Sequence, residues 1–194
     1  MRWGLRELAT LAADCGSAAF VAWVLLHPER LAQGQVQALL MGLMLFELLA
    51  AALAWVAGDG LARHGLNRGT ATGAVLLSMV YLAAAGLAAA ITGAWQVALA
   101  AAWLPAAKGL EAWSVRGGMA DKARALRRLA ALTAVCWLVY IVCLVYGAQH
   151  LGYMTLNARG ERVVDWHNGF AAGLTALYFI VLAVARVALR PASR

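Results

Sequence analysis

The stretch Val36–Ala57, VQALLMGLMLFELLAAALAWVA, decides the fold class of this chain. It is apolar apart from Gln37 and Glu47, and a helix needs about 20 apolar residues to cross the hydrocarbon of a bilayer. The chain has 194 residues, of which 64% are hydrophobic and 13% charged. One soluble core of this size cannot bury so much apolar surface. The composition therefore predicts an all-α, polytopic transmembrane bundle that forms a single membrane domain, residues 1–194.

Five further stretches have the length and character of membrane spans. They cover about 5–26, 70–90, 95–113, 126–146 and 166–189. We expect Gly58-Asp59-Gly60 to end the segment that begins at Val36, and Thr92-Gly93 to break the chain after the third segment. Pro105 lies inside segment 95–113, and proline is tolerated in membrane helices where neighbours satisfy the backbone. This segment therefore either crosses the membrane as one of six spans or lies flat at its interface, which leaves four or five.

The distribution of basic residues predicts the orientation. Six spans with the N-terminus inside place these residues in the cytoplasm: Arg2, Arg6, Arg63, Arg68, Lys108, Arg116, Lys122, Arg124, Arg127, Arg128, Arg186, Arg190 and Arg194. The outer side then holds three: Arg30, Arg159 and Arg162. Cytoplasmic loops of membrane proteins carry the excess of Lys and Arg. We therefore predict that both termini are cytoplasmic.

Composition also bounds the location and the partners. The high content of Ala, Leu, Gly and Arg is typical of a GC-rich bacterial genome, and we expect the bacterial cytoplasmic (inner) membrane. The formal charge of +7 belongs to the ends of apolar stretches, so it indicates orientation in a bilayer and not nucleic-acid binding. The expected partners are the lipid bilayer and either other membrane subunits or further copies of the chain.

Asp14 and Glu47 are the sharpest chemical feature. Each lies about nine or ten residues from the inner end of its segment, which is roughly 14–15 Å deep at the rise of an α-helix. Charged groups at that depth are costly and mark functional sites. Adjacent antiparallel helices would bring the two carboxyl groups to one level, with Lys108 as a further member. The two groups then form a proton or cation site, or they bind a neighbouring helix or a partner subunit.

A second polar group gathers at the outer ends of the fifth and sixth segments. It comprises His150, Asp165, His167 and Asn168. Histidine and carboxylate together bind divalent metals, but Asp165-x-His167 lacks the spacing of a strong metal site. Asp165 or Asn168 can equally cap the sixth helix, so we expect no bound metal. No two His residues lie at mid-depth on facing segments, which argues against haem, and no cofactor is expected.

One motif resembles that of a known family. Asp59-Gly60-Leu61-Ala62-Arg63, followed by Gly73, resembles the signature of the CDP-alcohol phosphatidyltransferases, which are also six-helix proteins of about this length. The resemblance covers about 25 residues and implies that Asp59 corresponds to a metal-binding acid. Val56, Leu77 and Tyr81 stand where that family has its other acids. One carboxylate cannot hold a two-metal catalytic site, so the resemblance implies at most a degenerate relative.

These features are compatible with three functions of the chain. The first is a non-catalytic subunit, accessory or scaffold component of a membrane complex, suggested by short loops and few polar groups within the helices. The second is a small ion- or proton-coupled transporter or channel that uses Asp14 and Glu47. The third is the degenerate phosphatidyltransferase relative. Other catalytic motifs are missing, so we predict no enzyme activity and no catalytic residues, and we favour the first function.

Overall fold

The fold described here is that of a computed structural model, which describes residues 5–27, 33–93, 95–115, 117–150, 154–156, 160, 162–164 and 169–188. Its elements are α1 (Leu5–Leu26), α2 (Gln33–His64), α3 (Arg68–Thr92), α4 (Trp95–Ser114), α5 (Met119–His150), β1 (Met154–Leu156), β2 (Arg162–Val164) and α6 (Gly169–Ala188). The prediction of a helical bundle is confirmed. Each of the six apolar stretches contributes one helix.

α2 extends beyond the predicted apolar segment. The helix continues through Gly58-Asp59-Gly60 to His64 and ends at Gly65, which has a left-handed φ of 64°. A glycine inside a helix costs only about 1 kcal/mol relative to alanine, so it need not stop one. Asn67 then caps α3, accepting a hydrogen bond from the backbone N–H of Thr70 at 2.8 Å. The predicted break after α3 is confirmed, because Gly93 adopts φ 70°.

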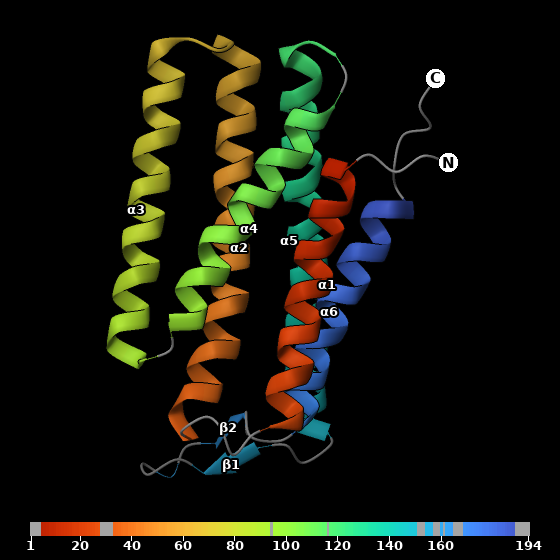
Figure 1. Cartoon of the computed structure of the whole chain (residues 1–194). Coiled ribbons are helices and arrows are strands. Elements are labelled where there is room, and N and C mark those ends of the chain that lie inside the picture. The colour runs from red at the N-terminus through yellow and green to blue at the C-terminus, as the bar shows by residue number, and fades with distance from the viewer. Residues whose placement is uncertain are drawn as a thin grey trace.

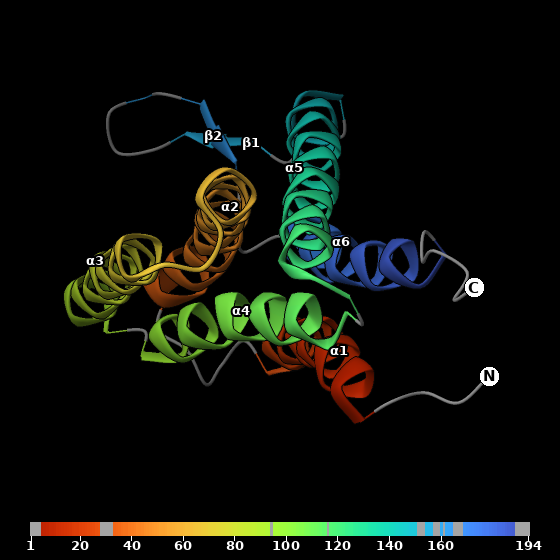
Figure 2. The same cartoon turned by 90° about the horizontal axis from the view of Figure 1, so that it is seen from above.

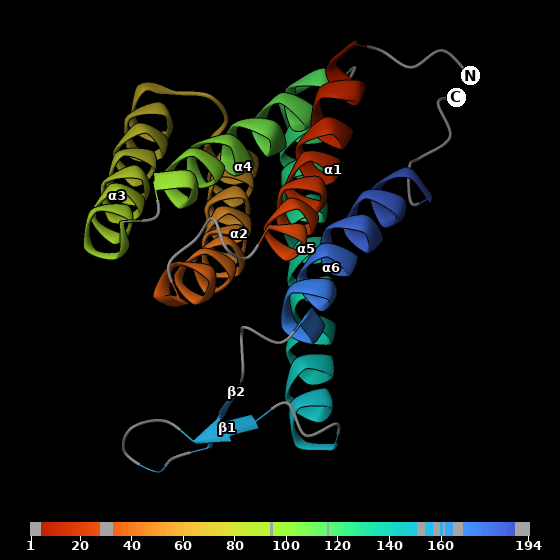
Figure 3. The same ribbon diagram turned by 60° about the horizontal axis from the view of Figure 1, so that its bottom comes forward.

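The connection between α5 and α6 differs from the expected loop, which began at Gly147. Helix α5 runs on to His150, and strands β1 and β2 then pair antiparallel, with Thr155 opposite Val163. Figure 3 shows this short ribbon at the end of the bundle where α5 ends and α6 begins. The expected start of the sixth segment at residue 166 lies outside the described residues.

Five helices close around the interior. α2 packs on α5, α5 on α6, α6 on α1, α1 on α4, and α4 again on α2. Figure 2 shows α4 crossing the open side of this ring, and α3 standing outside it against α2 and α4. Successive helices run in opposite directions, so the start of α1 and the end of α6 lie at one end of the bundle (Figure 1). The connections α2–α3 and α4–α5 lie at the same end.

Four helices, α2, α3, α5 and α6, are long and apolar enough to cross a membrane. This indicates a membrane protein. The exposed surface agrees, because α3 buries Tyr81, Ala85 and Ala89 and exposes large apolar side chains around them, among them Val75, Leu76, Met79, Val80 and Leu87. Within α1, Asp14–Val24 forms a shorter apolar stretch.

Gly58 holds α2 close to α5. A Cβ atom at Gly58 would lie 3.0 Å from the carbonyl oxygen of Ala123 and 3.0 Å from Cγ of Arg127. Gly60, two residues nearer the end of the same helix, has nothing within 4 Å of its Cβ position. The two glycines therefore form a matched pair for testing this contact.

We expect Gly58→Leu to destabilise the protein by about 1–3 kcal/mol, the usual cost of overpacking a close contact. Gly60→Leu should leave stability unchanged or raise it slightly, because leucine is the better helix former. Unfolding by SDS in mixed micelles measures both free energies. Equal effects of the two substitutions would contradict the packing of α2 on α5 described above.

Candidate functional site

Charged side chains occupy core positions on four helices. In α1 the buried positions are Asp14, Ala18, Val21 and Val24, and in α6 they include Thr175, Phe179, Leu182 and Arg186. In α4 the buried face carries Ala101, Leu104, Ala107, Lys108 and Ala112. Positions three or four apart share one helix face. The apolar stripe that packs each helix into the bundle therefore also directs a charged side chain inward.

Glu47 and Lys108 form a fully buried ion pair. Nζ of Lys108 donates to Oε1 of Glu47 at 2.6 Å, and the two side chains are 0% and 1% exposed. Glu47 lies near the middle of α2, and Lys108 lies on α4 where it crosses α2. Oε2 of Glu47 has no hydrogen-bond partner among the described residues. This oxygen atom can therefore accept a hydrogen bond or a proton inside the bundle.

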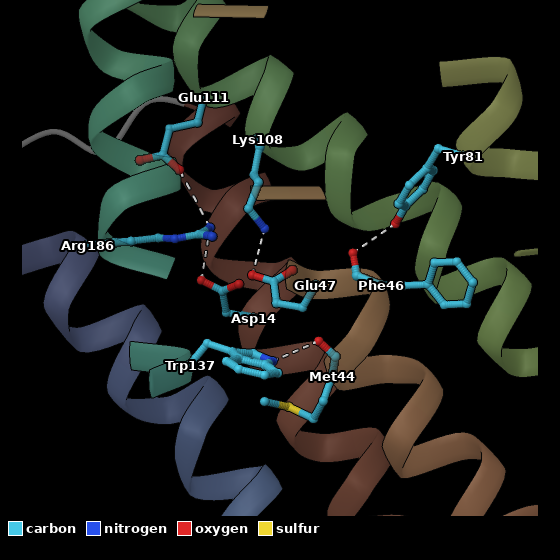
Figure 4. A network of polar contacts seen from close by, with 9 residues as sticks. All are labelled: Asp14, Met44, Phe46, Glu47, Tyr81, Lys108, Glu111, Trp137 and Arg186. Atoms are coloured by element: carbon cyan, nitrogen blue, oxygen red, sulfur yellow. Dashed lines mark hydrogen bonds and ion pairs between the residues drawn. The ribbon is translucent and has the colours of Figure 1, made fainter. Parts of the chain in front are cut away.

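Arg186 lies between two further acids. Its Nη1 is 3.0 Å from Oδ2 of Asp14 and 3.6 Å from Oε2 of Glu111. Asp14 comes from α1, Glu111 from α4 and Arg186 from the last turn of α6. Figure 4 shows the guanidinium group reaching between the two carboxyl groups, with the Glu47–Lys108 pair beside them. One cation thus links three helices.

These three ion pairs belong to one charged cluster, which we define as Asp14, Glu47, Lys108, Glu111 and Arg186. Asp14 interacts electrostatically with the other four members, and Lys108 interacts with Asp14 and Arg186 as well as with Glu47. The cluster holds three acids and two bases. In a low-dielectric interior such groups interact strongly. A change of charge at one member therefore alters the electrostatic energy of the others.

Hydrogen bonds to the α2 backbone surround Glu47. Nε1 of Trp137 on α5 donates to the carbonyl oxygen of Met44 at 3.1 Å, and the hydroxyl group of Tyr81 on α3 donates to that of Phe46 at 3.1 Å. The rings of Phe46 and Tyr81 also pack edge to face. Successive helix positions turn by about 100°, so Met44, Phe46 and Glu47 face α5, α3 and α4 respectively. This part of α2 is held from three sides (Figure 4).

The structure places the sequence candidates differently from expectation. Asp14 and Glu47 are both buried and both belong to the cluster, but α1 packs chiefly on α6 and α4 and not on α2. The two helices are not the adjacent pair that we expected, but the structure brings both carboxyl groups into one cluster with Lys108 (Figure 4). Asp14 on α1 is paired with Arg186 on α6, and Glu47 on α2 is paired with Lys108 on α4.

Two members of the cluster were missed by sequence reasoning. Arg186 was assigned to the cytoplasmic surface as one of the orienting basic residues, and Glu111 was not singled out. Arg186 is in fact buried, 8% exposed. Helical spacing could have identified both residues. Arg186 follows Leu182 by four residues on the apolar stripe of α6, and Glu111 follows Lys108 by three residues on α4.

Of the remaining candidates, His150 and Asp59 lie away from the cluster. His150 ends α5, hydrogen-bonds the carbonyl oxygen of Tyr146 through Nδ1 at 3.0 Å and stacks on the Tyr146 ring. Asp165, His167 and Asn168 lie outside the described residues. Asp59 is partly exposed near the end of α2, where its Oδ2 is 2.9 Å from Nε of Arg63. In the described parts of the chain, no three His, Cys, Asp or Glu side chains are grouped to hold a metal ion.

Comparison with known proteins does not indicate a function for this chain. No family model, no curated protein and no solved structure matches the chain. A function must therefore be argued from the buried charges themselves.

We expect Lys108→Met to destabilise the protein by about 3–5 kcal/mol, because it leaves Glu47 buried without its counter-charge. Adding Glu47→Gln should recover much of that loss, since the double variant no longer carries the unpaired acid. Unfolding by SDS in mixed micelles, arranged as a double-mutant cycle, measures the coupling. The exposed pair provides the control, and Asp59→Asn should change stability little. Strictly additive effects of Lys108→Met and Glu47→Gln would show that the two side chains are not paired.

Proposed function

We propose that the chain is a small proton-coupled membrane transporter or channel, with the charged cluster as the site that binds and passes on the proton. The observation that carries the proposal is the burial of four ionisable side chains, Asp14, Glu47, Lys108 and Arg186, in one cluster with the partly buried Glu111. Ionisable residues inside a membrane bundle commonly belong to proton relays and ion pathways.

Stability alone does not account for such a cluster. Taking a charge out of water costs several kcal/mol even after the protein relaxes, and apolar residues of similar volume often stabilise a core as well as a buried ion pair does. Five ionisable groups are therefore an expensive way to hold four helices together. A role that needs charge explains their presence better than packing does.

The balance of charge favours a proton as the bound species. The four buried members, two acids and two bases, balance one another, and the partly exposed Glu111 adds one negative charge beside Arg186. One added proton makes the five-membered cluster neutral, and neutrality is favoured where charges are withdrawn from water. The open Oε2 atom of Glu47 supplies an acceptor. A bound metal ion is less well supported, because the described acids are not grouped as ligands.

Arg186 can transmit the binding of a proton to the packing of the helices, through its contacts with two acids. Its Nη1 is closer to Asp14 than to Glu111, at 3.0 Å against 3.6 Å. Protonation of Asp14 would weaken the closer contact and favour the contact with Glu111. Because Asp14 is on α1 and Glu111 on α4, the exchange would alter how α6 is held against its two neighbours. Proton binding would thereby be coupled to helix packing.

We expect the wild-type protein, reconstituted in liposomes, to collapse a pH gradient under a potassium diffusion potential. Glu47→Gln should reduce this flux to the level of protein-free liposomes, because glutamine cannot accept or release the proton. An entrapped pH-sensitive dye measures the flux. Asp59→Asn is the matched control: it also removes one carboxylate from α2, but at an exposed position, and should leave the flux unchanged.

Correct folding of each variant is checked by its elution as a single species and by its helical circular dichroism. Two outcomes would overturn the proposal: a wild-type flux no greater than that of protein-free liposomes, or full flux through folded Glu47→Gln.

The role of a non-catalytic subunit or scaffold is the second candidate, and α3 favours it. This helix stands outside the ring of five and leaves most of its apolar surface uncovered by the chain. Lipid or another membrane subunit would cover that surface. Purification in mild detergent followed by mass spectrometry distinguishes the two, because a subunit should bring a partner in fixed stoichiometry.

We further propose six spans in the bacterial inner membrane, with the termini in the cytoplasm. The positions of the helix ends support this topology, because the connections α2–α3 and α4–α5 lie at the end of the bundle where α1 begins and α6 ends (Figure 1). A cysteine introduced at exposed Leu66, in a variant lacking Cys15, Cys136 and Cys143, tests it. We expect an impermeant maleimide to label this cysteine in inverted vesicles and not in intact spheroplasts, and the reverse pattern would overturn the orientation.

A further inference from the structure

α5 is too long to lie wholly within the hydrocarbon of a membrane, and its first three turns are its polar part. α5 has 32 residues, which corresponds to about 48 Å at 1.5 Å per residue, against about 30 Å of hydrocarbon. The apolar part of the helix begins at Leu129. Arg128, Arg127 and Arg124 precede it within roughly 8 Å along the axis. That is the depth at which lipid headgroups lie outside the hydrocarbon.

The end of α2 adds to the same surface. A Cβ atom at Gly58 would meet Ala123, Leu126 and the stem of Arg127, so the last turns of α2 lie beside the first turns of α5. Arg63 and Arg68 are exposed there, on the last turn of α2 and the first residue of α3. We call this surface the basic end and define it by these residues: Arg63, Arg68, Lys122, Arg124, Arg127 and Arg128.

Most of this positive charge is not neutralised by the chain. Asp59 pairs with Arg63 at 2.9 Å and Asp121 with Arg124 at 3.4 Å. Arg68 and Arg128 are exposed and have no ion-pair partner within the described ranges. The basic end thus has six basic side chains against these two acids, and both of its ion pairs are exposed and therefore weak.

An aromatic side chain marks the level of the membrane surface. Trp113, in the last turn of α4, is 52% exposed, and Nζ of Lys122 lies 3.9 Å from the centroid of its ring. Tryptophan is enriched at the boundary between headgroups and hydrocarbon. Its contact with Lys122 places that ammonium group at the same boundary, where lipid phosphates lie.

We propose that the basic end binds the headgroups of anionic phospholipids, with Arg124 and Arg128 as principal contacts. Arginine matches the geometry of phosphate oxygens through its planar guanidinium group, and basic residues beside a membrane are attracted to anionic lipid. This inference does not depend on proton transport, because it concerns a different surface and a different ligand.

The test uses the full chain in phosphatidylcholine vesicles that contain a trace of spin-labelled lipid. We expect the wild type to immobilise spin-labelled phosphatidylglycerol in preference to spin-labelled phosphatidylcholine, measured as the motionally restricted fraction of the electron paramagnetic resonance spectrum. Arg124→Gln with Arg128→Gln should lower this preference at least fivefold, since one basic residue contributes about fivefold to attraction by an anionic surface. High salt should lower it as well.

Arg162→Gln on β2 is the matched control, because it removes one arginine at the opposite end of the bundle and should leave the preference unchanged. Equal immobilisation of the two lipids by the wild type would overturn the proposal, as would an unchanged preference in the folded double variant. Loss of the preference in 10 mM inorganic phosphate, but not in sodium chloride of equal ionic strength, would assign the surface to soluble phosphate and also overturn it.

Discussion

The neutralisation of buried charge constrains the whole bundle. Asp14 and Glu47 would each be unstable in an apolar interior without a nearby cation. Their counter-charges come from other helices: Arg186 on α6 lies beside Asp14 and also beside Glu111, and Lys108 on α4 binds Glu47. The pairs can form only if α1, α2, α4 and α6 converge on one point, and that explains why α4 crosses obliquely between α1 and α2 (Figure 2).

Two kinds of contact hold the helices together around that point. Polar contacts meet α2 from three directions, through Trp137, Tyr81 and Lys108. Elsewhere the helices pack through small and aliphatic side chains such as Ala50, Ala101 and Leu182. Packing between apolar helices has little hydrophobic driving force within lipid. Specific polar contacts in the middle of the bundle therefore set which helices are neighbours, and small residues let them approach.

Charge in this chain also falls into two groups with different surroundings. The cluster is enclosed by protein, so its members respond to one another and its proton content controls its net charge. The basic end is exposed and is screened by salt, so it responds to what lies outside the chain. The first arrangement is suited to coupling between helices, and the second to recognition of a membrane surface. Lys108 and Arg186 show that a basic residue in the second half of a helix can be buried in the cluster and need not lie on the exposed surface.

The sequence by itself determined the class of protein and the position of each helix, because apolar length and composition are local properties that a bilayer selects directly. It also identified Asp14, Glu47 and Lys108 as unusual, since an ionisable residue in an apolar stretch is visible without a fold. Tertiary structure alone decided the pairings. Arg186 joined the cluster because α6 packs on α1, and Glu47 met Lys108 and not Asp14 because α4 lies between α1 and α2. Which helices become neighbours depends on contacts between residues far apart in the chain, and hydropathy carries no record of them.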